Sequence, residues 1–134
     1  MRARRIRVSS QGREVNVMVY PTREAMLAAA RRYNGNEFEP DTGGVTQQTV
    51  DQDGRTYTVL IRLHEGNLGT EVVSHEMHHA ATALYGSTLD DDVPARHVLD
   101  HANEEFAYLY SDLLSRLVRR LYALGYYDDA AVPR

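Results

Sequence analysis

The chain has 134 residues, of which 43% are apolar and 25% charged, a composition typical of a soluble globular protein and of one domain over residues 1–134. No apolar run approaches the roughly 18 residues of a membrane span and no apolar signal-peptide core follows the N-terminus, so we expect a cytoplasmic protein without membrane contact. The net charge of −4 argues against nucleic acid as a partner, and the absence of cysteine leaves His, Asp and Glu as the metal ligands available.

The N-terminal segment is predicted to form a β-hairpin. Residues 6–10 and 14–20 flank Gln11-Gly12, and valines alternate along the second run. Four arginines lie near the start of the chain, at Arg2, Arg4, Arg5 and Arg7. We interpret them as a solvated strand end, with a contact to phosphate or to an acidic partner as the alternative.

A short helix and a second strand pair follow. The helix is expected over residues 22–33, with Thr22 as its N-cap and Asn34-Gly35 as its end. Residues 44–50 and 55–63 then form strands around an Asp-Gln-Asp-Gly turn. One face of the second strand carries Tyr57, Val59, Ile61 and Leu63.

The second half of the chain has helical periodicity. One helix is expected from Thr70, its N-cap, to about Gly86, and after an acidic connector a long helix ends at Gly125. The apolar stripe of the long helix comprises Phe106, Tyr110, Leu113, Leu117, Leu121 and Leu124. The tail, residues 126–134, is expected to be frayed. The predicted fold is therefore α+β: a small, mostly antiparallel sheet with one early helix, then two further helices.

The first of these two helices carries the pattern H-E-x-x-H at His75, Glu76 and His79. Residues four apart share a helix face, so His75 and His79 can bind one metal ion while Glu76 lies close enough to act on a metal-bound water. From the composition we estimate roughly 0.02 accidental matches to the pattern. The alternative is a histidine-rich surface helix, and His78 is read as an exposed histidine outside the site.

The segment Asn103-Glu104-Glu105-Phe106-Ala107-Tyr108 on the following helix makes the pattern more specific. Together with H-E-x-x-H it resembles the gluzincin branch of the zincin metallopeptidases, in which a glutamate of a second helix completes a zinc site. The resemblance covers roughly residues 56–124. It implies a minimal zincin-like fold, Zn²⁺ as the cofactor, and His75, His79 and Glu104 as ligands.

Other ligands and supporting residues stay open. Glu105 and His101 are the alternatives to Glu104 as the third ligand. Family members often place Asp or Asn four residues after the ligand glutamate, where this chain has Tyr108. Asp100 or Asp112 would then orient a zinc-bound histidine, or Tyr108 would stabilise an oxyanion; the competing interpretation of Tyr108 is an aromatic residue packed at an interface.

The functional prediction is a zinc metallopeptidase in which Glu76 is the general base toward a metal-bound water and the substrate is a peptide or protein. Residues 55–63 are expected to offer a strand edge to that peptide. The alternative is a catalytically weak or inactive metal-stabilised binding module of zincin type. Compact domains of this kind occur in proteins associated with phages or mobile elements.

Overall fold

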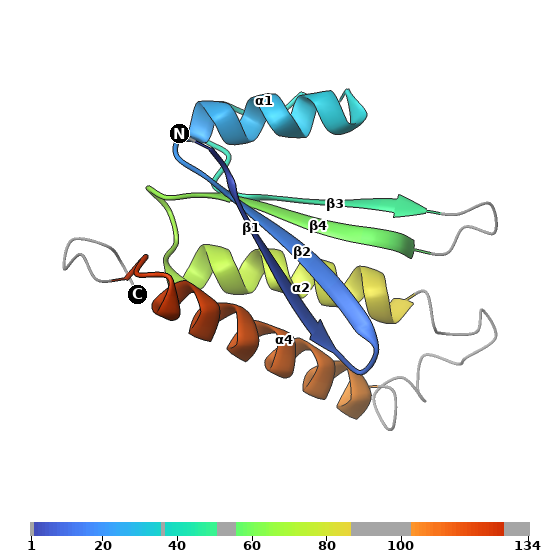
Figure 1. The fold of residues 1–134 in the computed structure, drawn as a ribbon. Coiled ribbons are helices and arrows are strands. Elements are labelled where there is room, and N and C mark those ends of the chain that lie inside the picture. Colours follow the sequence, from blue (N-terminus) through green and yellow to red (C-terminus); the bar gives the residue numbers. More distant parts are fainter. Residues whose placement is uncertain (1, 36, 51–55, 87–102, 128–134) are drawn as a thin grey trace.

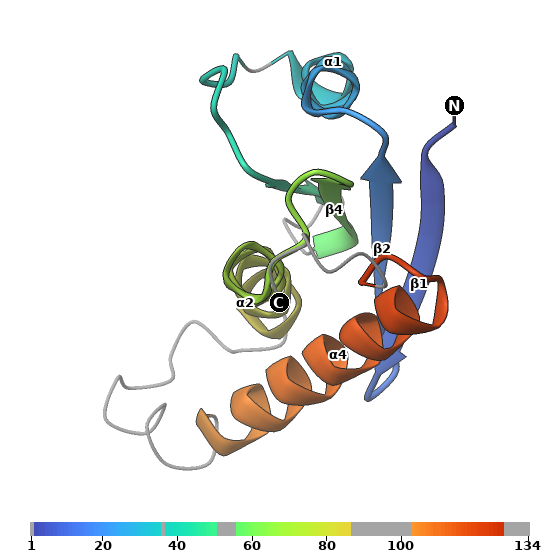
Figure 2. The same ribbon diagram turned by 90° about the vertical axis from the view of Figure 1, so that its left-hand side faces the viewer.

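The computed structural model describes residues 2–35, 37–50, 56–86 and 103–127. They form a layered α+β arrangement, with a four-stranded sheet between one helix on one face and two helices on the other (Figures 1 and 2). The predicted fold class is thereby confirmed. No helix in these ranges is both long and apolar enough to cross a membrane.

The N-terminal hairpin pairs β1 (Arg4–Ser10) with β2 (Arg13–Tyr20) in antiparallel register. Its two turn residues, Gln11 and Gly12, have φ angles of 54° and 73°, the left-handed conformation that two-residue hairpins require. Alternation brings Ile6, Val8, Val15, Val17 and Val19 into the core. The hairpin prediction is confirmed. The sequence could predict it because its signals are local.

The helix after the hairpin, α1 (Arg23–Asn34), has the predicted ends. The Thr22 hydroxyl accepts a hydrogen bond from the backbone N–H of Ala25 at 3.1 Å. At the other end Gly35 has a φ of 77°, and its N–H donates to the carbonyl of Arg31. Beyond Gly35 the chain returns to the sheet, where it forms the next strand.

The sheet has the order β1-β2-β4-β3, with β3 at Val45–Val50 and β4 at Thr56–His64. β3 and β4 are antiparallel as predicted, and β4 pairs with β2 in parallel. The prediction that residues 55–63 present a free edge is wrong. β4 lies inside the sheet because it has a partner on each side, and the edge strands are β1 and β3.

The opposite face of the sheet is covered by α2 (Thr70–Gly86) and α4 (Asn103–Ala123). Glu71 lies in the first turn of α2, as predicted. The leucines of the α4 stripe are fully buried at Leu113, Leu117 and Leu121, and Leu109 joins them. They pack with Val59, Ile61 and Leu63 of β4 in one core cluster.

The end of α4 differs from the expected frayed tail. Gly125 has a φ of 86°, and the N–H of Tyr126 donates to the carbonyl of Leu121, as in a left-handed helix cap. Tyr127 is only 3% exposed and belongs to the core cluster. Residues 126 and 127 are therefore packed rather than frayed, because Gly125 turns the chain back onto the helix. Residues 128–134 lie outside the described ranges.

Candidate metal site

The two histidines of the H-E-x-x-H pattern lie on the exposed face of α2. Their ring centroids are 4.7 Å apart, and their Nε2 atoms approach to 3.1 Å. Two nitrogens at about 2.05 Å from a tetrahedral zinc ion are separated by about 3.3 Å. The two Nε2 atoms are thus within hydrogen-bond distance of each other, and their separation is also close to the one that a shared ion requires.

Glu76, in contrast, is turned toward the sheet and is 6% exposed. The hydroxyl of Thr46, on β3, donates to its Oε1 at 2.7 Å and also lies 3.1 Å from its backbone carbonyl oxygen. Gly44, two residues before Thr46, leaves so little room that an added Cβ would lie 2.9 Å from Cγ of Glu76. The carboxylate is thus fixed between β3 and the histidine pair.

A groove of about 550 Å³ runs between β3 and this face of α2. Backbone and side chains of Gly44 to Gln48 form one wall, and His75, Glu76 and His79 lie on the other. Phe38, Thr82 and Ala83 complete the lining. The groove therefore contains the whole H-E-x-x-H motif together with an edge strand of the sheet.

The third histidine of the motif, His78, faces α4. Its ring makes edge contacts with Phe106 at 5.6 Å and with Tyr110 at 5.7 Å between centroids. The hydroxyl of Tyr110 donates to the backbone carbonyl of Ser74 at 3.3 Å. His78 is exposed, as predicted, and its ring also contacts the neighbouring helix.

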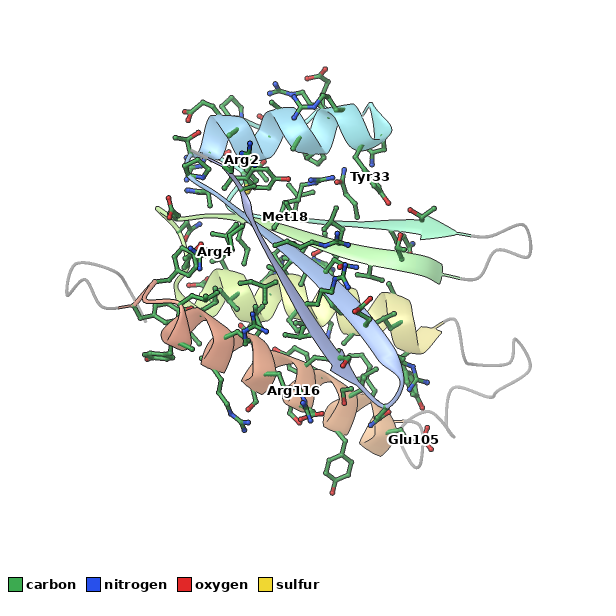
Figure 3. The ribbon with its side chains drawn as sticks, in the orientation of Figure 1. Arg2, Arg4, Met18, Tyr33, Glu105 and Arg116 are labelled. Carbon is green, nitrogen blue, oxygen red and sulfur yellow. The ribbon has the colours of Figure 1, made fainter. Side chains whose placement is uncertain are left out.

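Of the three candidates for the third ligand, only the side chain of Glu105 is described. It is exposed at the start of α4 (Figure 3) and accepts a hydrogen bond from the hydroxyl of Tyr85 at 3.3 Å. Burial first, and the nearby Glu105 carboxylate second, raise the pKa of Tyr85. The side chain of Glu104 and all of Asp100 and His101 lie outside the described residues.

The described ranges contain no group of three His, Asp or Glu side chains arranged to hold a metal ion. His75 and His79 supply two imidazole nitrogens, the ligand type that zinc favours. A complete site needs at least one further ligand. The assignment of Glu104, and of its alternatives, therefore stays a prediction.

Tyr108 and Asp112 lie at a different place from the one their proposed roles require. Both line a hollow at the N-terminal hairpin that also includes Ser10, and Tyr108 is 66% exposed. A hydrogen bond from Ser10 and another from Arg116 lower the pKa of Asp112, and Arg116 Nε lies 3.1 Å from its carboxylate. Neither residue lines the groove with the histidine pair, because position 108 is about 200° around the helix from Phe106, which faces α2.

Sequence reasoning did not find Thr46 and Gly44, although both contact Glu76. Gly43-Gly44 and the polar run Thr46-Gln47-Gln48-Thr49 are visible in the sequence as a strand with few apolar residues. The sequence does not show that this strand is the edge of the sheet next to α2.

Comparison of the chain with protein-family models, with curated proteins and with solved structures finds no match.

Proposed function

We propose that the chain is a zinc-dependent metallopeptidase-like protein that cleaves a peptide bound in the groove between β3 and α2. The observation that carries the proposal is the convergence of the His75 and His79 Nε2 atoms, 3.1 Å apart, beside a carboxylate fixed by Thr46. His75 and His79 would hold the ion, with Glu104 proposed as the third ligand. When bound, zinc supplies a Lewis acid and a water whose pKa is lowered to about 7.

The protein's own contribution begins with Glu76. Its carboxylate, one residue from His75, would accept the proton of the attacking water and then deliver it to the departing amine nitrogen. The Thr46 hydroxyl holds Oε1 in place and leaves Oε2 for the proton. Since an orienting donor is already present, the carboxylate does not need to be positioned by the substrate.

The substrate would lie along β3. β3 is an edge strand of the sheet, the position at which an extended peptide can add as a further strand, and such a peptide would run across the groove past the motif. Phe38 and Ala83 offer apolar surface to one of its side chains. We therefore propose Val45–Val50 as the strand contact, since residues 55–63 lie inside the sheet.

Metal content tests the site before activity is considered. Purified wild-type chain, dialysed against zinc and then against buffer, is expected to keep one zinc ion per chain, and His79→Ala is expected to lose it. The matched control is His78→Ala, which removes a neighbouring histidine that contacts α4 and should keep the zinc. Loss in His78→Ala with retention in His79→Ala would contradict the assignment.

The same assay on Glu104→Ala, Glu105→Ala and His101→Ala identifies the third ligand. We expect only Glu104→Ala to release the metal. Retention in all three variants would mean that the ligand set proposed from the second helix is wrong.

Hydrolysis of a peptide library then distinguishes an enzyme from a binding module. Glu76→Gln should keep its zinc and lose roughly 10²–10⁴-fold in turnover. Equal turnover in this variant would refute the mechanism. The second candidate function, a catalytically weak or inactive zincin-like binding module, predicts zinc and peptide binding by the wild type without cleavage.

A further inference from the structure

A second candidate site lies on the other face of the sheet, under α1. A hollow of about 340 Å³ is lined there by residues from β1, β2, β4 and α1, and its volume is within the range of small-molecule sites. In Figure 3, Tyr33 extends from α1 toward the sheet and Met18 lies on the same side of β2. The lining is Arg5, Asn16, Met18, Tyr33, Thr58, Val59, Leu60 and Arg62.

The unusual member of this set is Arg62, a cation that is only 6% exposed. Its Nε donates to Oε1 of Gln47 at 2.8 Å and its Nη1 donates to the hydroxyl of Tyr20. The guanidinium carbon lies 5.3 Å from the centre of the Tyr33 ring. These partners are all uncharged, and among the described residues Arg62 forms no ion pair.

A buried charge without a counter-ion is costly, because neutral donors and acceptors replace only part of its hydration. A guanidinium has five N–H groups, and the two bonds described use two of them. The others can serve a ligand in the hollow, since no acidic side chain is among the described residues that line it.

Arg5 adds a second guanidinium to the same hollow. Its Nε and Nη2 atoms both donate to Oδ1 of Asn16, at 3.2 and 3.0 Å, which fixes the side chain over the strand. Two arginines therefore line one cavity whose remaining surface includes Met18, Leu60 and the Tyr33 ring. Arginine is suited to planar oxyanions, and aromatic and aliphatic surfaces are suited to a flat apolar body.

We propose that this hollow binds a small organic oxyanion, a carboxylate or a phosphate ester, whose charged group contacts Arg5 and Arg62 and whose apolar body lies against Tyr33, Met18 and Leu60. The site does not depend on the proposed metal site, which lies on the α2 side of the sheet.

Calorimetric titration of the whole chain at neutral pH and low ionic strength tests the proposal with benzoate and phenyl phosphate as probes. At least one of them is expected to bind saturably, and the one that binds more tightly identifies the charged group. Benzamide has the ring without the charge, and acetate and inorganic phosphate have the charge without the ring. We expect each of these three to bind at least tenfold more weakly. Failure of both probes to bind, or equal binding by benzamide, would overturn the proposal.

Variants locate the binding in the hollow. Arg5→Ala and Tyr33→Leu should each weaken the preferred probe, Arg5→Ala by about tenfold, without requiring the loss of the buried Arg62. Arg7→Ala is the matched control, since Arg7 is exposed on the same strand but does not line the hollow. Equal weakening by Arg7→Ala would mean that only general positive charge is being measured. His79→Ala should bind the probe like the wild type, so the outcome is distinct from that for the metal site.

Discussion

The contact between Thr46 and Glu76 can be tested without knowing the substrate. Thr46→Val preserves the shape and the β-branched character of the side chain and removes only its hydroxyl. The lost hydrogen bond is short, 2.7 Å, and its acceptor is a carboxylate that is 6% exposed. A hydrogen bond to a charged group contributes about 1.5–3 kcal/mol. Because the groove next to Glu76 admits water, which can replace part of the lost bond, we expect the lower end, about 1.5 kcal/mol.

For a domain of this size that loss lowers the midpoint of thermal unfolding by about 4–6 °C, and circular dichroism can measure it. Thr46→Ser is the control: it retains the donor and should recover most of the difference. Zinc content should be unchanged in both variants, whereas peptide turnover should fall in Thr46→Val because the general base loses its orientation. An unfolding midpoint equal to that of the wild type would refute the reasoning, since it would show that water positions Glu76 as well as the hydroxyl does.

Two further predictions concern stability. Burial lowers the pKa of His64 below 6.5. Between that lowered value and 6.5 the unfolded chain therefore binds more protons than the folded chain. The stability that neutral His64 contributes is fully present above pH 6.5 and falls as the pH decreases through this window. Urea unfolding at a series of pH values should show that this group changes the free energy of unfolding by at most about 1.4 kcal/mol per pH unit. His64→Leu should remove this contribution. An unchanged pH dependence in the variant would contradict the assignment. Gly44→Ala places a Cβ 2.9 Å from Cγ of Glu76 and 3.3 Å from Cδ2 of the buried Leu63, and should cost about 1–3 kcal/mol in thermal or urea unfolding. Gly43→Ala should cost less, since its nearest atom is the end of the flexible Asn67 side chain; equal costs would show that Glu76 can move away.

The parts of the fold that the sequence predicted correctly are those determined by neighbouring residues. The hairpin depends on two residues with positive φ, and the ends of α1 depend on Thr22 and Gly35. The stripe of α4 depends on three- and four-residue spacing. In each case the physical cause lies within a few residues of its effect, so the pattern is sufficient.

The position of β4 was not predictable in this way. Val59, Ile61 and Leu63 indicate one buried face, but Arg62 and His64, which are buried on the other face, look like solvated residues in the sequence. Gln47 and Tyr20, from two other strands, accept hydrogen bonds from Arg62 and offset part of the cost of its burial. Such partners are distant in the chain, so alternation alone suggested a strand with one solvated face and a free edge.

The same distinction between local and long-range causes applies to the candidate site. The spacing of His75 and His79 on one helix is local, and the structure brings their nitrogens together as expected. The contact of Glu76 with Thr46 depends on where β3 lies relative to α2, and the positions of Tyr108 and Asp112 depend on which face of α4 packs. Resemblance to a family suggested roles for the last two, but it could not place them.

The arrangement around α2 follows from the helix period of about 100° per residue and limits where a third ligand can come from. Relative to His75, Glu76 is rotated by about 100° toward β3, and His78 is rotated by about 60° in the other direction, toward α4. Glu76 and Thr46 fill the β3 side, and His78 with Phe106 fills the α4 side, so the histidine pair lies exposed between them. If the site holds zinc, a third ligand is needed, and the side chains of Glu104 and His101, proposed for that position, lie outside the described residues. The metal assay on Glu104→Ala and His101→Ala tests that requirement directly.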